Sequence, residues 1–434
     1  MRASVHTIGC RLNQAETALL ANRLKQDGYQ LVEFGQPTDL LVLNTCAVTE
    51  EAEKACRYDV RRTLRHSPHA FVAVTGCYAQ TGAEALRRVP GIDLIVGAQY
   101  KMNLPDYLPA RSSLQKRSDP ELFHTKRITR DDFALEGAGE STTTRVNLKI
   151  QDGCNAMCSF CIIPFTRGRE RSRRVDDVLR EAEELVARGH RELVLTGVNI
   201  GQYRQEGITF VSLIRRLEDM DGLARIRISS IEPTTISDDL LEYMATSRKL
   251  CRYLHVPLQS GDDGILQAMN RRYTTKEYIA VIEKIVSRIP DIGLGTDLMV
   301  GFPGENEPEF EQTYRLVSDL PFAYFHIFSF SKRPGTAAAR LHNTLDPAMV
   351  KSRSKALAEL SRRKRMAFYQ RYIGTRVQVL FETRSDDGLW TGLTDNYLRL
   401  AVSSPGDLTN TIREVTVTGV MDGLAIGQAP ERQA

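Results

Sequence analysis

The stretch that decides the fold is Asp152-Gly-Cys-Asn-Ala-Met-Cys-Ser-Phe-Cys161, which spaces three cysteines as C-x3-C-x2-C. It follows the apolar run Val146–Ile150, which is predicted to be a strand. Three thiolates at this spacing can hold one metal ion or three corners of an iron–sulfur cube. A structural zinc ion needs a fourth protein ligand, and the nearest histidines in the sequence are His124 and His190. The spacing therefore favours a cluster with one iron free to bind another group, and three buried structural thiols are the alternative.

The strand before these cysteines is the first of six apolar runs that alternate with helical patterns. The predicted strands are Val146–Ile150, Glu192–Leu195, Arg225–Ile228, Tyr253–Val256, Gly293–Met299 and Tyr324–Phe328. Six such units over about 200 residues predict a partial (βα)6 barrel at residues 145–345, with its chemistry at the carboxyl ends of the strands. The polar loops at these ends are Thr196-Gly-Val-Asn199, Ser229-Ser-Ile-Glu232, Pro257-Leu-Gln-Ser-Gly261 and Gly301-Phe-Pro-Gly304.

The first hundred residues show the same alternation of short strands and helices, which predicts a parallel α/β domain at residues 1–110. Cys10, Cys46 and Cys77 each come just after a predicted strand of this sheet. Because consecutive parallel strands end at one edge of a sheet, the three cysteines are expected to converge. We therefore predict a second cluster site there, with three unrelated buried cysteines as the alternative. Cys56 and Cys251 lack such placement and are taken as ordinary thiols.

Three further segments complete the α/β multidomain organisation. Residues 111–144 are rich in Pro, Ser, Thr, Gly and mixed charge and are predicted to be a linker. Residues 346–374 are predicted to be a basic connecting helix, and residues 351–376 carry a charge of +8. Residues 375–434 show alternating apolar residues and turn signals, which predict a small antiparallel β-barrel.

The composition is that of an ordinary globular protein. The 434 residues hold 58 Lys and Arg against 54 Asp and Glu, with 42% hydrophobic residues, which excludes a disordered or collagen-like chain. No apolar run approaches the ~18 residues needed to cross a bilayer. We therefore expect a cytoplasmic protein with no membrane contact, whose eight cysteines stay reduced unless they bind a metal.

The cysteine spacing after the first barrel strand resembles that of the radical S-adenosylmethionine superfamily. The resemblance implies a 4Fe-4S cluster on Cys154, Cys158 and Cys161, whose free iron chelates the amino and carboxylate groups of S-adenosylmethionine. One electron then cleaves the sulfonium and releases a 5′-deoxyadenosyl radical. A radical is suited to an aromatic C–H bond, because such a bond has no acidic proton for acid–base chemistry to use.

The whole chain resembles the methylthiotransferase family, which joins a three-cysteine domain, a radical barrel and a TRAM domain. The segments that carry the resemblance are the two cysteine triads, Cys161-Ile-Ile-Pro-Phe-Thr-Arg-Gly168, His255-Val-Pro-Leu-Gln-Ser-Gly261 and Thr296-Asp-Leu-Met-Val-Gly-Phe-Pro-Gly304. The stretch His6–Thr17 is most similar to the branch that acts on N6-threonylcarbamoyladenosine beside the tRNA anticodon. The resemblance implies two 4Fe-4S clusters, one S-adenosylmethionine that supplies a methyl group and another that supplies the radical for carbon 2 of the adenine.

Three alternatives remain open at this point. Two are enzymatic: methylthiolation of isopentenyladenosine in tRNA, or of an aspartate in a ribosomal protein. The third is an iron–sulfur protein without turnover that binds RNA or senses redox state, although such a protein needs no S-adenosylmethionine pocket.

No residue is assigned as catalytic, and the other site predictions fall into two groups. Residues expected to bind S-adenosylmethionine are Phe160, Thr196, Gly197, Asn199, Ser230, Glu232 and Gln259. Residues expected to bind RNA are Arg167, Arg169, Arg171, Arg173, Arg174, Arg362, Arg363, Lys364, Arg365, Trp390, Tyr397 and Arg399. His255 is either a substrate contact or a satisfied core histidine. Residues 377–434 carry a charge of −4, so this β module is less basic than a domain that grips RNA by charge. The expected partners are tRNA, a reductant such as flavodoxin or ferredoxin, and a sulfur donor.

Overall fold

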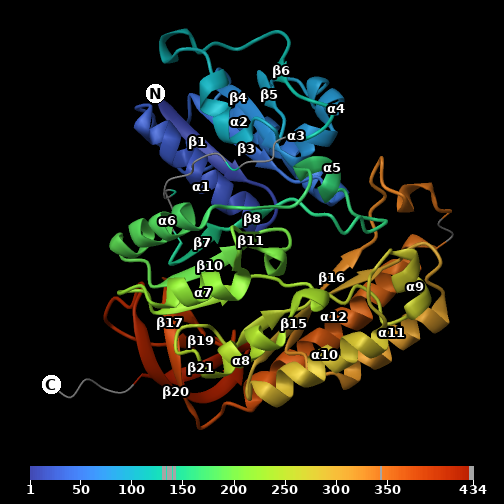
Figure 1. Cartoon of the computed structure of the whole chain (residues 1–434). Coiled ribbons are helices and arrows are strands. Elements are labelled where there is room, and N and C mark those ends of the chain that lie inside the picture. Colours follow the sequence, from blue (N-terminus) through green and yellow to red (C-terminus); the bar gives the residue numbers. More distant parts are fainter. Residues whose placement is uncertain (130–132, 134–138, 140–142, 343–344, 430–434) are drawn as a thin grey trace.

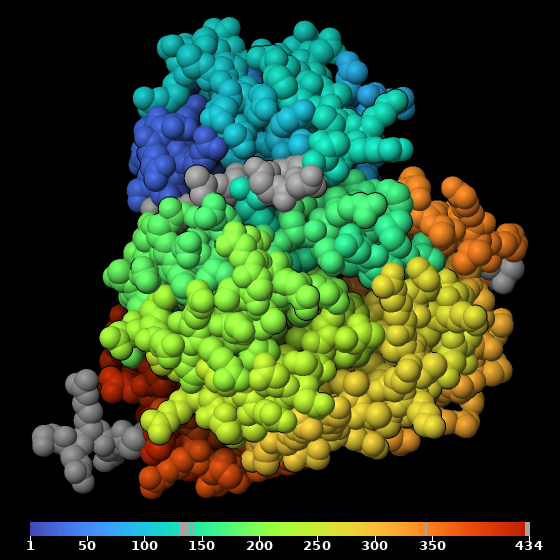
Figure 2. Space-filling view, viewed as in Figure 1, coloured from blue at the N-terminus to red at the C-terminus, as the bar shows by residue number. Residues whose placement is uncertain are grey.

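The computed structural model describes residues 1–129, 133, 139, 143–342 and 345–429. Three parts are arranged in order along the molecule (Figure 1): an amino-terminal α/β domain, a central barrel and a carboxyl-terminal β-barrel beneath it. The space-filling view in Figure 2 shows the blue and cyan amino-terminal residues seated on the green part of the central barrel. The α/β multidomain architecture predicted from the sequence is confirmed.

The amino-terminal domain is built on a parallel sheet of strand order β2-β1-β3-β4-β5-β6. Its strands are β1 (Arg2–Thr7), β2 (Gln30–Leu31), β3 (Leu40–Thr45), β4 (Phe71–Gly76), β5 (Leu94–Val96) and β6 (Glu121–Phe123). Its helices are α1 (Arg11–Gln26), α2 (Glu50–His66), α3 (Cys77–Thr81) and α4 (Ala83–Arg87), followed by the 3-10 helices η1 (Lys101–Tyr107) and η2 (Arg111–Ser113). The central strands β3 and β4 are buried along their whole length, as expected for a parallel sheet covered on both faces.

The segment expected to be a linker differs from the prediction at its start. Residues Glu121–Phe123 form β6, which adds to the edge of the amino-terminal sheet beside β5. These three residues alternate little in polarity, so the pairing was not visible in the sequence. Most of the later part of the predicted linker lies outside the described residues.

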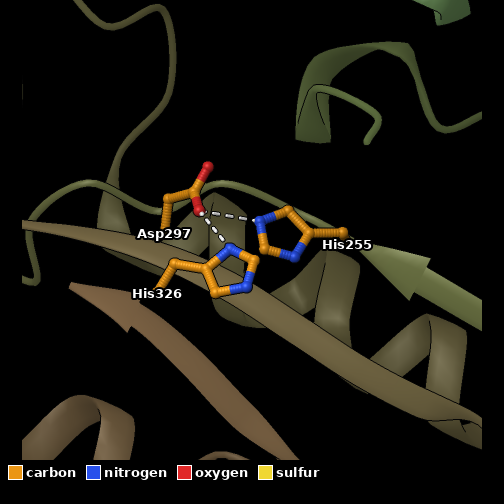
Figure 3. A group of neighbouring side chains, drawn as sticks. All are labelled: His255, Asp297 and His326. Atoms are coloured by element: carbon orange, nitrogen blue, oxygen red, sulfur yellow. Dashed lines mark ion pairs between the residues drawn. The ribbon is translucent and has the colours of Figure 1, made fainter. Parts of the chain in front are cut away.

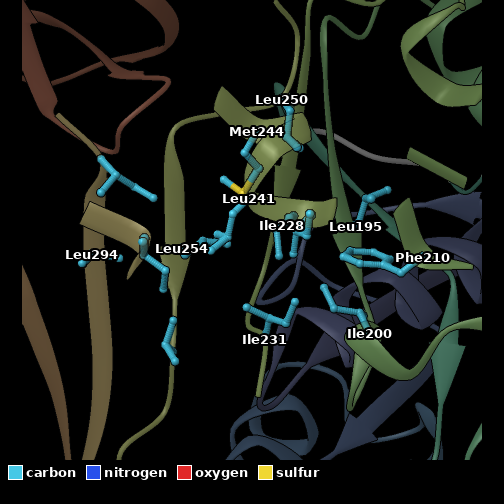
Figure 4. Packing of buried hydrophobic residues seen from close by; sticks show 14 of the residues in the cluster. Leu195, Ile200, Phe210, Ile228, Ile231, Leu241, Met244, Leu250, Leu254 and Leu294 are labelled. Carbon is cyan, nitrogen blue, oxygen red and sulfur yellow. The ribbon is translucent and has the colours of Figure 1, made fainter. Parts of the chain in front are cut away.

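The central barrel contains the six predicted parallel strands in two three-stranded sheets, β13-β10-β7 and β14-β15-β16. The strands are β7 (Arg145–Lys149), β10 (Glu192–Thr196), β13 (Arg225–Ile228), β14 (Tyr253–His255), β15 (Gly293–Val300) and β16 (Tyr324–Ser329). Their outward side chains, among them Leu195, Ile228 and Leu254, pack against the covering helices in one apolar core (Figure 4). The opposite face of the strands is polar and lines the inside of the barrel.

The helices that cover the barrel follow their strands in order. They are α5 (Ile163–Arg167), α6 (Val175–Ala187), α7 (Phe210–Glu218), α8 (Asp238–Thr246), α9 (Asp263–Ala268), α10 (Thr275–Arg288) and α11 (Glu307–Asp319). Two short ladders flank the first units: β8 (Gln151–Asp152) with β9 (Arg171–Ser172), and β11 (Arg204–Gln205) with β12 (Ile208–Thr209). The basic segment forms α12 (Pro347–Gln370), which packs along β16 at the edge of the barrel.

The carboxyl-terminal domain is a closed five-stranded barrel. Its strands are β17 (Arg376–Arg384), β18 (Trp390–Thr394), β19 (Arg399–Val402), β20 (Ile412–Met421) and β21 (Leu424–Gln428). All pairings are antiparallel except that of β19 with β21, which is parallel. The domain is fastened to the central barrel by Arg227, which is fully buried, pairs with Glu192 at 2.6 Å and donates to the carbonyl oxygens of Thr394 and Asp395.

No helix in the described part of the chain is both long enough and apolar enough to span a membrane.

Candidate active site

The amino-terminal cysteines converge at one edge of the sheet, as the sequence predicts. Cys10 lies just after β1 and caps α1, Cys46 follows β3, and Cys77 begins α3 directly after β4. Since β1, β3 and β4 are neighbours, their carboxyl ends bring the three thiols together. The pKa of Cys46 is raised to about 12, chiefly by burial and in smaller part by the neighbouring Cys77 and Cys10 thiols, whereas Arg167 acts in the opposite direction.

Gly9 shows how closely the first two loops approach each other. A Cβ atom added to Gly9 would lie 2.7 Å from the Cβ of Cys46 and 3.3 Å from its Sγ. Gly9 also has a φ of 120°, a conformation that side chains rarely adopt. Asn13 secures the pair from α1, because its amide donates to the carbonyl oxygens of Ile8 and Thr45 at 3.0 and 3.1 Å. The side chain of Asn13 therefore holds together the loops that carry Cys10 and Cys46.

The second triad occupies a single loop at the carboxyl end of the first barrel strand. Cys154 receives a hydrogen bond from the backbone of Ala156, and Cys161 donates through its own backbone to Cys158. The pKa of Cys161 is raised to about 12, chiefly by burial and in smaller part by the neighbouring Cys158 and Cys154 thiols. Thiols with such a pKa carry protons at neutral pH, so a bound cationic group has to displace those protons.

The two triads face each other across the boundary between the domains. Ile162, the residue after Cys161, is buried in the same apolar cluster as Cys46 and Cys77. Helix α3, which begins with Cys77, packs against α5, which begins two residues after Cys161. The amino-terminal domain therefore covers the cysteine loop of the barrel.

A buried network of charges locks this boundary. Arg167, at the end of α5, donates to Asn13 at 2.6 Å, to Glu16 at 2.9 Å and to Asp152 at 3.0 Å. Lys149 adds an ion pair to Glu16 at 3.0 Å, and Lys101 of η1 pairs with the same carboxylate. Burial would raise the pKa of Glu16, but these three cations hold it well below its usual range. The network links the helix capped by Cys10 to the residues on both sides of the barrel triad.

A second arginine ties the loop after β16 to the amino-terminal domain. Arg333 is buried, pairs with Glu53 of α2 and donates to the carbonyl oxygen of Ala47 at 3.4 Å. Ala47 directly follows Cys46. The last strand of the barrel is thereby connected to the Cys46 loop.

The loop after β10 fits the amino-acid part of S-adenosylmethionine. The Oγ1 atom of Thr196 and the Oδ1 atom of Asn199 are buried and have no hydrogen-bond partner. Both are acceptors, and an ammonium group is the donor that would satisfy them. The loop is fixed by Gln151, whose Oε1 accepts from the backbone of Val198 and Asn199 at 2.9 and 2.8 Å. A side chain at Gly197 would lie 2.9 Å from the carbonyl oxygen of Gln151, so this close approach requires glycine.

The other predicted cofactor residues are placed around the same end of the barrel. Phe160 packs partly buried beside Met299, in a small apolar cluster. Glu232 pairs with Arg271, which also donates to the Sγ of Cys158 at 3.3 Å. Ser230 is within 3.5 Å of the carbonyl oxygen of His255. Gln259 has a φ of 73° and bridges β15 through its backbone, which donates to Asp297.

The predicted RNA-binding residues divide into exposed and buried members. Arg167 and Arg173 are buried, and Arg173 is fully buried in an ion pair with Glu181. Arg171 pairs with Asp152 at 3.1 Å. The run of arginines after the cysteine loop therefore does not form one solvated face, and we remove these three from the RNA surface. Exposed arginines remain at Arg169, Arg174, Arg362, Arg363, Arg365 and Arg399, and Lys364 is half-buried and donates to Leu320.

The two aromatic residues predicted to stack on RNA bases are also engaged within the protein. Trp390 is buried in the core of the carboxyl-terminal barrel. Tyr397 stacks on Tyr253 at 4.3 Å between ring centroids and receives a hydrogen bond from Arg11 at 3.2 Å. Tyr397 thus joins the domains, and we correct the prediction that these two residues stack on unpaired bases.

Several site residues were not identified from the sequence. They are Asn13, Glu16, Lys101, Lys149, Asp152, Arg271, Asp297, His326 and Arg333. The sequence held a signal for two of these residues, because Lys149 is a charged residue inside a predicted buried strand and Asp152 follows that strand closely. A charge at such a position has to be paired.

Comparison with protein families and curated proteins gives consistent matches over most of the chain. Residues 148–317 match the Radical SAM superfamily, and residues 2–97 match Uncharacterized protein family UPF0004. The chain is 34% identical over 420 residues to threonylcarbamoyladenosine tRNA methylthiotransferase MtaB of Bacillus subtilis (strain 168), with 95% of this chain and 92% of that protein covered. It is 36% identical over 405 residues to the protein of the same name from Aquifex aeolicus (strain VF5), covering 92% and 96%.

Two other matches widen this picture. The tRNA-2-methylthio-N(6)-dimethylallyladenosine synthase of Ruegeria pomeroyi is 35% identical over 412 residues, covering 93% of each chain. Among solved structures, the radical S-adenosylmethionine methyltransferase TsrM from Kitasatospora setae, with cobalamin and a [4Fe-4S] cluster bound, aligns with a TM-score of 0.54. That alignment covers 78% of this chain and 76% of TsrM at 14% identity, so it shows a shared fold.

Proposed function

This chain belongs to the radical S-adenosylmethionine methylthiotransferase family, and from this membership we propose that it attaches a methylthio group to carbon 2 of N6-threonylcarbamoyladenosine beside the anticodon of tRNA. The observation that carries the proposal is the pair of cysteine triads that meet at one domain boundary, with Ile162 buried against Cys46 and Cys77. A methylthio transfer needs a sulfur carrier and a radical source close together, and this boundary provides one site for each.

The residues of the chain have distinct tasks in this proposal. Cys154, Cys158 and Cys161 would hold one 4Fe-4S cluster, and Cys10, Cys46 and Cys77 would hold the other. The Oγ1 atom of Thr196 and the Oδ1 atom of Asn199, which are unpartnered in the structure, would accept hydrogen bonds from the amino group of S-adenosylmethionine. When bound, the clusters and S-adenosylmethionine supply the radical chemistry that an aromatic C–H bond requires. The protein positions these groups and excludes water from them.

Arg271 joins the cluster loop to the proposed cofactor pocket. It donates to Cys158 and pairs with Glu232, while its guanidinium stacks over Tyr273 at 4.9 Å. A hydrogen bond to a ligand sulfur stabilises the more negative state of a cluster. Glu232 is the partly exposed member of the pair, and its carboxylate could accept hydrogen bonds from the ribose hydroxyls of the cofactor.

The tRNA surface that we propose consists of exposed arginines from three parts of the chain. Arg169 and Arg174 lie beyond the cysteine loop, and Arg365 of α12 lies 5.6 Å above the ring of Tyr324. Arg399 of the carboxyl-terminal barrel is exposed near the same helix, since its backbone donates to the hydroxyl of Tyr369. Arg365 lies over Tyr324 of β16, so a phosphate next to a base inserted into the barrel would meet this cation.

A reductant and a sulfur donor complete the proposed reaction. Reductive cleavage of S-adenosylmethionine consumes one electron, for which a small protein such as flavodoxin or ferredoxin is the expected source. The methylthio group also contains a sulfur atom. Because S-adenosylmethionine acts here as a donor of methyl groups, this sulfur has to come from a separate donor.

Mass spectrometry of nucleosides from total tRNA tests the proposal. Cells that lack this gene are expected to lose the methylthio form of threonylcarbamoyladenosine and to accumulate its precursor. The wild-type gene should restore the product, Cys154→Ala should not, and the double substitution Arg365→Gln/Arg399→Gln should restore it only in part because it weakens phosphate contacts. An unchanged nucleoside profile in the deleted strain would exclude a tRNA substrate. Loss of the methylthio form of isopentenyladenosine would instead assign the other substrate of the family.

A further inference from the structure

Two histidines and an aspartate form a connected group on the inner face of the barrel (Figure 3). His255 ends β14, Asp297 lies in β15 and His326 lies in β16. The Oδ1 atom of Asp297 lies 2.9 Å from Nε2 of His255 and 3.3 Å from Nδ1 of His326. Within the part of the chain that the structure describes, this is the one set of three or more His, Cys, Asp or Glu residues whose ligating atoms all lie within 4.8 Å of one another.

The exposure of the three side chains increases from a buried end at His255 to an open end at His326. The side chain of His255 is 6% exposed, that of Asp297 is 21% exposed and that of His326 is 55% exposed. Tyr324 closes the buried end, with its hydroxyl 3.3 Å from Nδ1 of His255. Gly295 makes room for this contact, since a Cβ atom there would lie 2.6 Å from the Tyr324 ring. The open end presents the remaining nitrogen of His326, Nε2, to the inside of the barrel.

The hydrogen bonds orient the exposed ring. Burial would raise the pKa of Asp297, but hydrogen bonds from His255 and His326 hold it well below its usual range. Asp297 is therefore an ionised acceptor of the Nδ1–H of His326. This arrangement leaves Nε2 free to accept a hydrogen bond when the ring is neutral and to donate one when it is protonated.

The group lies next to the part of the barrel that meets the cysteine loop. Met299, two residues along β15 from Asp297, packs in the apolar cluster that includes Phe160, which lies between Cys158 and Cys161. Phe328, opposite Met299 on β16, is 42% exposed and lies edge-on to His326 at 6.3 Å. An exposed aromatic ring beside a polar group suits a flat base that carries a polar substituent.

The surroundings favour a polar and anionic substituent. Arg11 of the amino-terminal domain reaches the hydroxyl of Tyr397, which stacks 5.8 Å from Tyr324. Arg365 lies above Tyr324. A threonylcarbamoyl group offers a hydroxyl, a carboxylate and amide groups, whereas an isopentenyl group offers only hydrocarbon. An apolar substituent packed against His326 would leave its Nε2 atom without a hydrogen-bond partner, because only Nδ1 is paired with Asp297.

On the basis of the function proposed above, we propose that His326, oriented by Asp297 and His255, binds the polar threonylcarbamoyl substituent of the target adenosine and selects it over the isopentenyl substituent. Asp297 and His255 are positioning residues, because they act through His326. The family contains relatives named for each of the two substituents, so a specificity determinant of this kind is required somewhere in the fold.

A divalent cation is the competing occupant of the same three side chains, since two histidines and one carboxylate are a ligand set that iron and related ions accept. The exposed ring of Phe328 beside His326 favours the base of an RNA as the occupant. In the hydrogen-bonded arrangement, the two histidine nitrogens that face Asp297 both donate to its Oδ1 atom. The other nitrogen of His255, Nδ1, lies 3.3 Å from the hydroxyl of Tyr324 at the buried end of the group.

The experiment compares anticodon stem-loop RNAs that carry threonylcarbamoyladenosine, isopentenyladenosine or adenosine at the same position. Binding to the holoenzyme is measured by fluorescence anisotropy. The wild type is expected to prefer the threonylcarbamoyl RNA. His326→Leu should reduce that preference about tenfold or more, as for loss of a hydrogen bond to a charged group, and His326→Gln should retain part of it. His69→Leu, an exposed histidine on the amino-terminal domain, is the matched control.

Two further measurements keep the result interpretable. The cluster absorption spectrum and RNA-independent formation of 5′-deoxyadenosine are expected to be unchanged in His326→Leu, which separates recognition from folding and cofactor loading. An unchanged preference in His326→Leu, or a stoichiometric divalent ion that the wild type binds and this variant loses with no change in preference, would overturn the inference. If the wild type fails to modify the threonylcarbamoyl RNA at all, the proposed function itself fails, and the two outcomes are thereby distinguished.

Discussion

The two cysteine triads are built in opposite ways. Cys154, Cys158 and Cys161 lie within eight residues of one loop, so local chain geometry alone brings them together. Cys10, Cys46 and Cys77 come from the ends of three strands and meet only when the amino-terminal sheet is formed. The geometry of the barrel triad therefore depends on one loop, whereas that of the amino-terminal triad depends on the folded sheet. Changes in the sheet and at its boundary should therefore disturb the two sites unequally.

The largest expected effect comes from removing one ligand from each triad. Cys154→Ala should abolish reductive cleavage of S-adenosylmethionine, because the radical source loses a ligand. Cys46→Ala should spare cleavage and abolish methylthio transfer, because only the second cluster is affected. The measurements are 5′-deoxyadenosine formation, methylthio product, and iron content, which should fall in each variant.

The matched control is Cys251→Ala, which removes a buried cysteine that neither triad includes. It should retain both activities and the full iron content. Cleavage that persists in Cys154→Ala would contradict the assignment of the radical site to the barrel. Loss of cleavage in Cys46→Ala would show that the two sites are not separable.

The next effect concerns the contact that joins the triads. Arg167→Leu removes the donor to Asn13, Glu16 and Asp152 and leaves buried carboxylates without their partner. Breaking a buried ion pair in this way costs roughly 3 to 5 kcal/mol. Scanning calorimetry should show this loss as a lower unfolding temperature, with the amino-terminal cluster lost before the barrel cluster.

Arg169→Leu is the control for this change, since Arg169 is two residues away and exposed. Its unfolding temperature should be that of the wild type. Equal effects of the two substitutions would mean that Arg167 contributes no more than a surface charge. Arg167→Lys should recover part of the stability, because one ammonium replaces only some of the hydrogen bonds of a guanidinium.

The triads also show what a sequence can reveal. Both were predictable because cysteine is rare and its chemistry is specific, and because parallel strands end at a common edge. The order of the barrel strands followed from their apolar periodicity. Which arginines are buried could not be predicted, because a run of charged residues along the chain contains no information about burial. Arg169 and Arg174 are exposed, whereas Arg167 and Arg173 are among the most buried side chains in the protein.

The polar interior of the barrel was hidden for a related reason. Asp297 and His326 each lie among mostly apolar residues of a strand, so neither stands out as part of a polar motif. They meet only through the pairing of β15 with β16, where they stand directly opposite each other. Tyr397 was misplaced because its partner ring, Tyr253, belongs to another domain.

The smallest expected effect tests the dependence of the amino-terminal triad on its sheet. Gly9→Ala places a Cβ atom 2.7 Å from the Cβ of Cys46 at a φ of 120°. Gly189→Ala also puts alanine at a positive φ, 94°, but no atom lies within 4 Å of the added carbon. The control should cost about 1 kcal/mol from backbone strain alone, and Gly9→Ala should cost about 1 to 3 kcal/mol and displace Cys46. Iron analysis should find the barrel cluster retained in Gly9→Ala and the amino-terminal cluster depleted. If both clusters persist at full occupancy, the Cys46 loop can shift without losing its cluster. The amino-terminal triad would then depend less on the exact geometry of the sheet than its origin in three strands implies.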